Sequence, residues 1–122
     1  MLLNDFYKIL NINKVTDNEL IAEIKINTGH KIFDGHFPNN PVVPGVVSVQ
    51  IINEILSKHL DKKLMTSKAR SIKFPAIINP NITPKLLIKI NYFPTEKDNY
   101  KINAQIYFEE TVFLKFNGTF IF

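Results

Sequence analysis

The second half of the chain alternates apolar and more polar residues with a period of two, and this pattern constrains the fold more than any other feature. Three alternating sets follow one another: Leu86, Ile88, Ile90 and Tyr92; then Ile102, Ala104, Ile106 and Phe108; then Val112, Leu114, Phe116, Phe120 and Phe122, with Gly118 in register. Because successive side chains of a strand point to opposite faces of a sheet, each set indicates a half-buried antiparallel strand. The polar segments 96–99 and 109–110 are predicted to be the turns between them.

Further strands are predicted for residues 20–26, which alternate in the same way, near residues 6–12, and for residues 68–74. Residues 44–60 are the exception, because this apolar run is too long for a strand and begins with Pro-Gly, a helix start signal. On a helical wheel the apolar residues form one wide arc: Val49, Ile51, Ile52, Ile55, Leu56 and Leu60. A narrow stripe holds Val46, Gln50, Asn53, Glu54 and Ser57. We therefore predict one α+β domain over residues 1–122, an antiparallel sheet wrapped around one long central helix.

The composition is that of a soluble globular protein, with 45% hydrophobic and 21% charged residues in 122. The absence of cysteine excludes disulfides and thiolate chemistry, and it fits a cytoplasmic location. The sequence shows no signal peptide and no apolar run long enough to span a membrane. The net charge of +4 could suit an acidic partner, but the lysines are scattered singly, which argues against nucleic-acid binding. No spacing typical of metal ligands or of a phosphate-binding loop is present, so no metal or cofactor is expected.

Residues 35–45, GHFPNNPVVPG, hold a single histidine, His36, among three prolines and two glycines. Proline fixes φ, so this segment would hold the imidazole in one place. Histidine is the side chain best suited to proton transfer near neutral pH, although a histidine in such a turn can also simply bond to backbone carbonyls.

The longer stretch GHFPNNPVVPGVVSVQ resembles the signature of the hotdog-fold β-hydroxyacyl-acyl-carrier-protein dehydratases, which reads roughly GHFPxxPxxPGVxxxE, with Asp as the last residue in one branch. Eight positions match: Gly35, His36, Phe37, Pro38, Pro41, Pro44, Gly45 and Val46. A weaker match is FPAIINP at residues 74–80, where Asn81 follows in place of the usual glycine. The resemblance implies a hotdog fold, which agrees with the sheet and helix predicted above.

The resemblance also implies a reaction, the removal of water from a 3-hydroxyacyl thioester to give a trans-2-enoyl thioester. Such chemistry serves fatty acid, pigment or polyketide synthesis, with acyl carrier protein or coenzyme A as the carrier. His36 would match the base that takes the C2 proton. Backbone N–H groups near Gly45 and Val46, at the start of the helix, could stabilise the enolate oxygen. Phe33 and Phe37 are expected to line the substrate site as wall residues or to belong to the core.

This sequence departs from the family at Gln50, where the family has Glu or Asp. Glutamine cannot release a proton and can only form hydrogen bonds, either to the substrate or to the helix around it. Glu54 lies one turn further, on the same helix face, where many members carry Gln. Glu54 could take over the acid role, or it could bind Gln50 or a tunnel wall instead.

In the family, the base of one subunit meets the helix residue of its partner across a dimer interface. The resemblance therefore implies a homodimer or a larger oligomer, with edge strands pairing. Two other functions stay open. The first is a hotdog acyl-thioesterase, in which Gln50 orients a water or the carbonyl. The second is a non-catalytic member that binds acyl thioesters or pairs with an active homologue.

Overall fold

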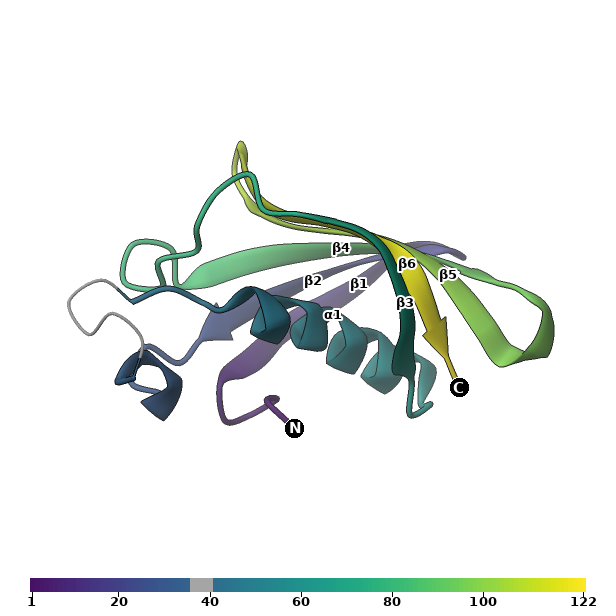
Figure 1. Cartoon of the computed structure of the whole chain (residues 1–122), viewed down its shortest axis with the longest axis horizontal. Helices are drawn as coiled ribbons and strands as arrows, with labels where there is room; N and C mark the ends of the chain where they lie inside the picture. The colour runs from purple at the N-terminus through teal and green to yellow at the C-terminus, as the bar shows by residue number, and fades with distance from the viewer. Residues whose placement is uncertain (36–40) are drawn as a thin grey trace.

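The structure is a computed structural model that describes residues 1–35 and 41–122. The described part contains six strands, one long helix and two short 3-10 helices (Figure 1). The strands are β1 (Tyr7–Thr16), β2 (Glu19–Ile26), β3 (Met65–Lys73), β4 (Lys85–Pro94), β5 (Asn99–Phe108) and β6 (Thr111–Ile121). The helix α1 (Gly45–Leu60) precedes β3, and the 3-10 helices are η1 (Lys31–Phe33) and η2 (Glu96–Asp98).

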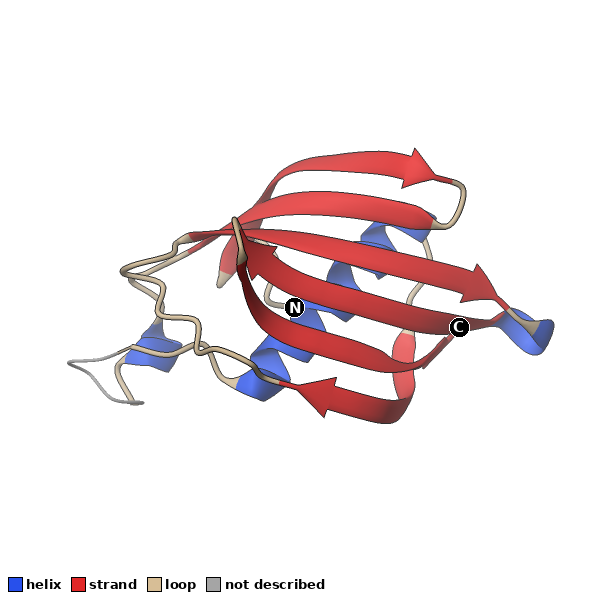
Figure 2. Cartoon of the chain, turned by 90° about the horizontal axis from the view of Figure 1, so that it is seen from above, coloured by secondary structure: helices blue, strands red, loops and turns tan. Residues whose placement is uncertain are grey.

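All neighbouring strands pair antiparallel in one sheet, in the order β1-β2-β4-β5-β6-β3. The helix α1 lies along one face of this sheet, which curves over it (Figure 1). Figure 2 looks onto the sheet with the helix behind it, and β1 and β3 form the two edges. This arrangement confirms the predicted antiparallel sheet wrapped around one central helix. The predicted helix and strands are all present, although β1 runs on to Thr16.

The core lies between the inner face of the sheet and α1. The strand register places the predicted apolar rows opposite one another, as in Ile24 to Leu86 and Ile88 to Ile106. The wide apolar arc of the helix faces these rows, and its central residues are fully buried: Ile51, Ile52, Ile55 and Leu56. Full burial of a side chain of this size contributes about 1.5–3 kcal/mol, so these rows hold the helix against the sheet.

Strand β6 departs from the predicted alternation at both ends. A register shift in the β5–β6 pairing lies where Leu114 pairs with Ile106 and Val112 with Tyr107, so Phe113 is the extra residue. Phe113 is consequently buried, whereas the pattern placed it on the outer face. Phe122 was predicted on the core face but is 61% exposed, because it lies beyond the end of β6, where its ring contacts the Lys62 ammonium.

The edge strand β3 differs from the other strands because almost all of its side chains are exposed. The exposed apolar side chains Ile72, Phe74 and Ile77 lie at its end and in the loop that follows. An unpaired edge presents free backbone N–H and C=O groups that another strand can bind. This edge, with its exposed apolar side chains, is therefore suited to association with a second chain.

Candidate functional site

The helix α1 begins directly after the histidine motif and leaves two backbone donors free. Pro44 is the N-cap residue, and its carbonyl accepts hydrogen bonds from the N–H groups of Val47, at 3.1 Å, and Ser48, at 3.2 Å. Within residues 1–35 and 41–122, the N–H groups of Gly45 and Val46 have no hydrogen-bond partner. Because the helix dipole adds positive potential at this end, the two donors can stabilise a negative oxygen.

Phe74 explains structurally why position 45 is a glycine. A Cβ on Gly45 would lie only 2.6 Å from Cζ of Phe74, so the ring fills the space that a side chain would need. Beside this contact lies a cavity of about 200 Å³, bordered mainly by apolar groups, among them Val43, Phe74, Ile77, Ile78 and Phe113. The motif match had drawn attention to Phe74. Nothing in the sequence indicated Phe113, because the bulge that turns it inward is invisible in the alternation.

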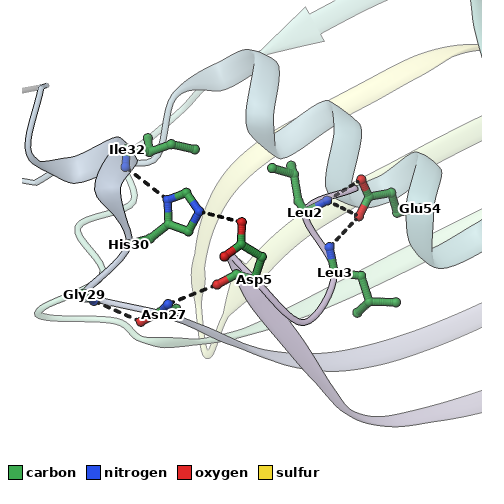
Figure 3. Close-up of polar contacts among 8 residues, drawn as sticks. All are labelled: Leu2, Leu3, Asp5, Asn27, Gly29, His30, Ile32 and Glu54. Atoms are coloured by element: carbon green, nitrogen blue, oxygen red, sulfur yellow. Dashed lines mark hydrogen bonds and ion pairs between the residues drawn. The ribbon is translucent and has the colours of Figure 1, made fainter.

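Gln50 and Glu54 are brought together on the same face of α1, as their spacing predicted. The Gln50 Nε2 donates to Oε2 of Glu54 at 3.0 Å. The Glu54 side chain is only 3% exposed, and three other groups also donate to it. They are the N–H of Leu2, at 2.9 Å, the N–H of Leu3, at 2.9 Å, and the hydroxyl of Tyr7, at 3.1 Å (Figure 3 shows the two backbone contacts).

All four partners of the Glu54 carboxylate are donors, so it acts here as an acceptor. Burial raises the pKa of Tyr7 well above its usual range, and the negative charge of Glu54 and their hydrogen bond raise it further. Tyr7 therefore keeps its proton and continues to donate. Because Glu54 accepts from the amide nitrogen of Gln50, the amide oxygen is left for other partners. Gln50 is exposed and thus presents an acceptor at the surface.

The segment before β1 is fixed at two points, which sequence reasoning missed (Figure 3). Its start is bound by Glu54, and further on the Asp5 carbonyl accepts from Nδ2 of Asn27 at 3.0 Å. His30 accepts from the N–H of Ile32 through Nδ1, so its Nε2 carries the proton and donates to the Asp5 carboxylate at 3.0 Å. No local signal in the sequence predicts these contacts, because the partners are far apart along the chain.

Among the site residues predicted from sequence, the structure gathers Val46, Gln50 and Glu54 around one cavity of about 420 Å³, which Met1 and Leu2 also border. Gly45 lies on the other side of the helix start, at the apolar cavity. Phe33 borders neither cavity. It is buried in the core, with its ring centroid 5.3 Å from that of Phe6.

His36 and Phe37 lie outside the described residues, so their predicted roles stay predictions. The described segments hold no group of three His, Cys, Asp or Glu side chains arranged to bind a metal ion. They also contain no helix with the length and apolar character needed to cross a membrane.

Comparison with known proteins agrees with this fold. The model of the ApeI-like family, described as ApeI dehydratase, matches residues 12–116. The 3-hydroxyacyl-[acyl-carrier-protein] dehydratase FabZ of Lactobacillus helveticus is 26% identical over 132 residues, covering 98% of this chain and 87% of the relative.

Two solved structures share the architecture. The dehydratase heterocomplex ApeI:P from Xenorhabdus doucetiae superposes with a TM-score of 0.73 at 18% identity, covering 93% of this chain and 96% of the other. A thioesterase from Haemophilus influenzae superposes with a TM-score of 0.60 at 12% identity, covering 93% and 76%. At these identities the two structures support the fold alone.

Proposed function

Because the chain belongs to the ApeI-like dehydratase family, we propose that it removes water from a 3-hydroxyacyl thioester to give a trans-2-enoyl thioester. This proposal rests mainly on the geometry at the start of α1. The free N–H groups of Gly45 and Val46 lie at the end of the histidine motif, and Gly45 borders an apolar cavity. A thioester carbonyl that accepts from these donors would have its enolate stabilised, and an acyl chain would suit the cavity.

In the proposed reaction, His36 takes the proton from C2 of the substrate. The C2 electron pair forms the double bond to C3, the C3–O bond breaks, and the hydroxyl group leaves. Glutamine cannot protonate this leaving group, so we assign the second proton transfer to His36 as well. The proton removed from C2 passes to the departing oxygen, and water is released. Gln50 holds the hydroxyl through hydrogen bonds during this step.

Glu54 acts in this proposal as a positioning residue, because it is buried and fixes the Gln50 amide. Direct proton donation by Glu54 stays a prediction, which substitution tests below. Substrate contacts of Phe37 and Phe33 likewise stay predictions. For Phe33, the burial beside Phe6 favours a core role.

We further propose a homodimer in which β3 pairs with the β3 of a second copy. The exposed edge and the apolar side chains of Ile72, Phe74 and Ile77 support this arrangement. Pairing of two such edges would join the two sheets into one and cover the apolar groups. The dehydratase heterocomplex ApeI:P suggests a different chain as the alternative partner. The molar mass of the purified protein in solution separates dimer from monomer.

The carrier of the acyl group is proposed to be acyl carrier protein, as the name of the Lactobacillus relative indicates for that enzyme, or else coenzyme A. A cytoplasmic location is proposed with it. Neither nucleic acid nor a membrane is expected as a partner.

Thioester hydrolysis is the second candidate function, and the orientation of Gln50 favours it. With its nitrogen bound to Glu54, the amide presents an oxygen that could accept a hydrogen bond from a water and orient that water. Hydrolysis would release a free thiol and a carboxylic acid, without forming an enoyl product. A non-catalytic member would bind acyl thioesters and form neither product.

One reaction mixture distinguishes these functions. Purified protein is incubated with 3-hydroxyacyl thioesters of several chain lengths, and enoyl absorbance and free thiol are followed together. We expect enoyl formation that His36→Ala abolishes and that the control His59→Ala retains. Thiol release without enoyl product would replace dehydration by hydrolysis, and binding without either product would make the chain a non-catalytic member.

A further inference from the structure

A groove lined by cations crosses the outer face of the sheet, at the end where the chain terminates. Its volume is about 340 Å³, and among its lining residues are Lys68, Arg70, Lys101, Asn99, Asn117 and Thr119. On β5 and β6 these positions alternate with the buried Tyr100, Ile102, Phe116 and Phe120. The groove therefore lies on the face opposite α1, which Figure 2 shows from outside.

Strand pairing brings the three cations together from two strands that are not neighbours. Lys101 on β5 pairs with Thr119 on β6, and Thr119 pairs in turn with Lys68 on β3. Since neighbouring strands lie about 4.8 Å apart, the Cα atoms of the two lysines are about 10 Å apart. Arg70 joins them at a register shift in β3, where it is the extra residue and has no partner in the β6 ladder.

The charges in this groove are not balanced by the protein. No ion pair or hydrogen bond links the side chains of Lys68, Arg70 or Lys101 to any group in the described ranges. The lining contains no carboxylate, and the remaining polar side chains are amides and hydroxyls, which can donate hydrogen bonds. Three like charges at this spacing repel one another, so an anion in the groove would be favoured.

We propose that this groove binds a small molecule through phosphoryl groups that carry at least two negative charges. Arginine binds phosphate oxygens through two parallel hydrogen bonds, and lysines add point charges. The volume falls in the range of small-molecule sites, at its lower end. No residue of the helix start lines the groove, so the proposal is independent of the proposed dehydratase activity. The phosphoryl groups could belong to a free diphosphate or to the nucleotide head of coenzyme A.

Titration calorimetry on the full chain at low ionic strength tests this site, with pyrophosphate, coenzyme A and pantetheine as probes. Low salt is chosen because exposed charges are screened at higher concentrations. The double variant Arg70→Gln, Lys101→Gln removes two positive charges from the groove. A matched control, Lys31→Gln, Lys85→Gln, removes two charges from exposed positions elsewhere. Thermal unfolding followed by circular dichroism verifies that both variants fold.

We expect saturable pyrophosphate binding that weakens at least about tenfold in the groove variant and changes less than about twofold in the control. Tighter binding of coenzyme A than of pyrophosphate, with none for pantetheine, would identify the nucleotide head as the ligand. Equal binding of the two would identify a free diphosphate. The proposal is overturned if neither probe binds saturably, or if both double variants bind pyrophosphate equally well.

Discussion

Replacing Glu54 by glutamine tests the role of the buried carboxylate that joins α1 to the start of the chain. The substitution keeps the shape of the side chain but turns one acceptor oxygen into a donor. If the new amide nitrogen lies at the position of Oε2, it faces the N–H of Leu2 and the Nε2 of Gln50, both of which are donors. The other oxygen keeps its bonds to Leu3 and Tyr7.

The expected cost follows from these contacts. Each hydrogen bond to a charged acceptor contributes about 1.5–3 kcal/mol, and two such bonds are lost. The exposed Gln50 amide can turn its oxygen toward the new donor, which recovers about 1 kcal/mol. We therefore expect the free energy of unfolding to fall by about 3 kcal/mol. Because domains are stable by about 5–15 kcal/mol, the variant should still fold.

Urea unfolding followed by far-ultraviolet circular dichroism measures this loss. At an m-value of about 1.5 kcal/mol/M, the midpoint should fall by about 2 M. Glu110→Gln, in the exposed β5–β6 turn, is the matched control and should stay within about 0.5 kcal/mol of the wild type. A loss below about 1 kcal/mol for Glu54→Gln would refute the anchoring role of this carboxylate.

Turnover of the same variant separates positioning from proton donation. If Glu54 only fixes the Gln50 amide, its substitution weakens one hydrogen bond to the substrate and slows dehydration about tenfold. If Glu54 is the proton donor, the variant should be as inactive as His36→Ala under conditions where it is folded. That second result would replace the mechanism with one in which His36 and Glu54 share the proton transfers.

Three further changes have defined outcomes. Folded Tyr7 keeps its proton above about pH 10, where the unfolded chain releases it, so the unfolded state binds fewer protons there. Tyr7 should leave the free energy of unfolding unchanged below about pH 10 and lower it by about 1.4 kcal/mol per pH unit above that. Tyr7→Phe should remove this contribution when unfolding is measured across that pH range. Gly118→Ala should destabilise the fold by about 1–3 kcal/mol in thermal unfolding, because its Cβ would overlap the Lys68 carbonyl oxygen. Unchanged stability of this variant would contradict so close an approach of the two strands. Gln50→Glu should speed dehydration most at low pH, because the adjacent Glu54 charge raises the pKa of the new carboxyl and keeps it protonated. An unchanged rate would show that dehydration is not limited by the lack of a proton donor at position 50.

The sheet and helix could be predicted because local sequence patterns indicate them. The alternation through Leu86 and Ile106 and the long apolar arc of α1 set the core faces, and the structure confirms both. The burial of Phe113 could not be predicted, because a bulge shifts the register by one residue and no local sequence pattern indicates this bulge. Phe122 lies beyond the strand end, where the alternation no longer applies.

In the candidate site, too, only the contacts between residues close in sequence could be predicted. The i, i+4 spacing placed Gln50 and Glu54 on one helix face, and their side chains are in contact. The other partners of Glu54 come from Leu2, Leu3 and Tyr7, about fifty positions earlier in the chain. Such a contact depends on how the finished fold brings the chain start to the helix, so neither spacing nor composition indicates it.

Hydration in heavy water tests the proposed chemistry most directly, because dehydration is reversible and its reverse leaves an isotopic label. A trans-2-enoyl thioester is incubated with the protein in D2O, and the product is analysed by mass spectrometry after exchange back into H2O. We expect a 3-hydroxyacyl thioester that keeps one deuterium at C2, formed by the wild type and not by His36→Ala. Recovery of unlabelled enoyl thioester, or of free acid and thiol alone, would contradict the proposed dehydration.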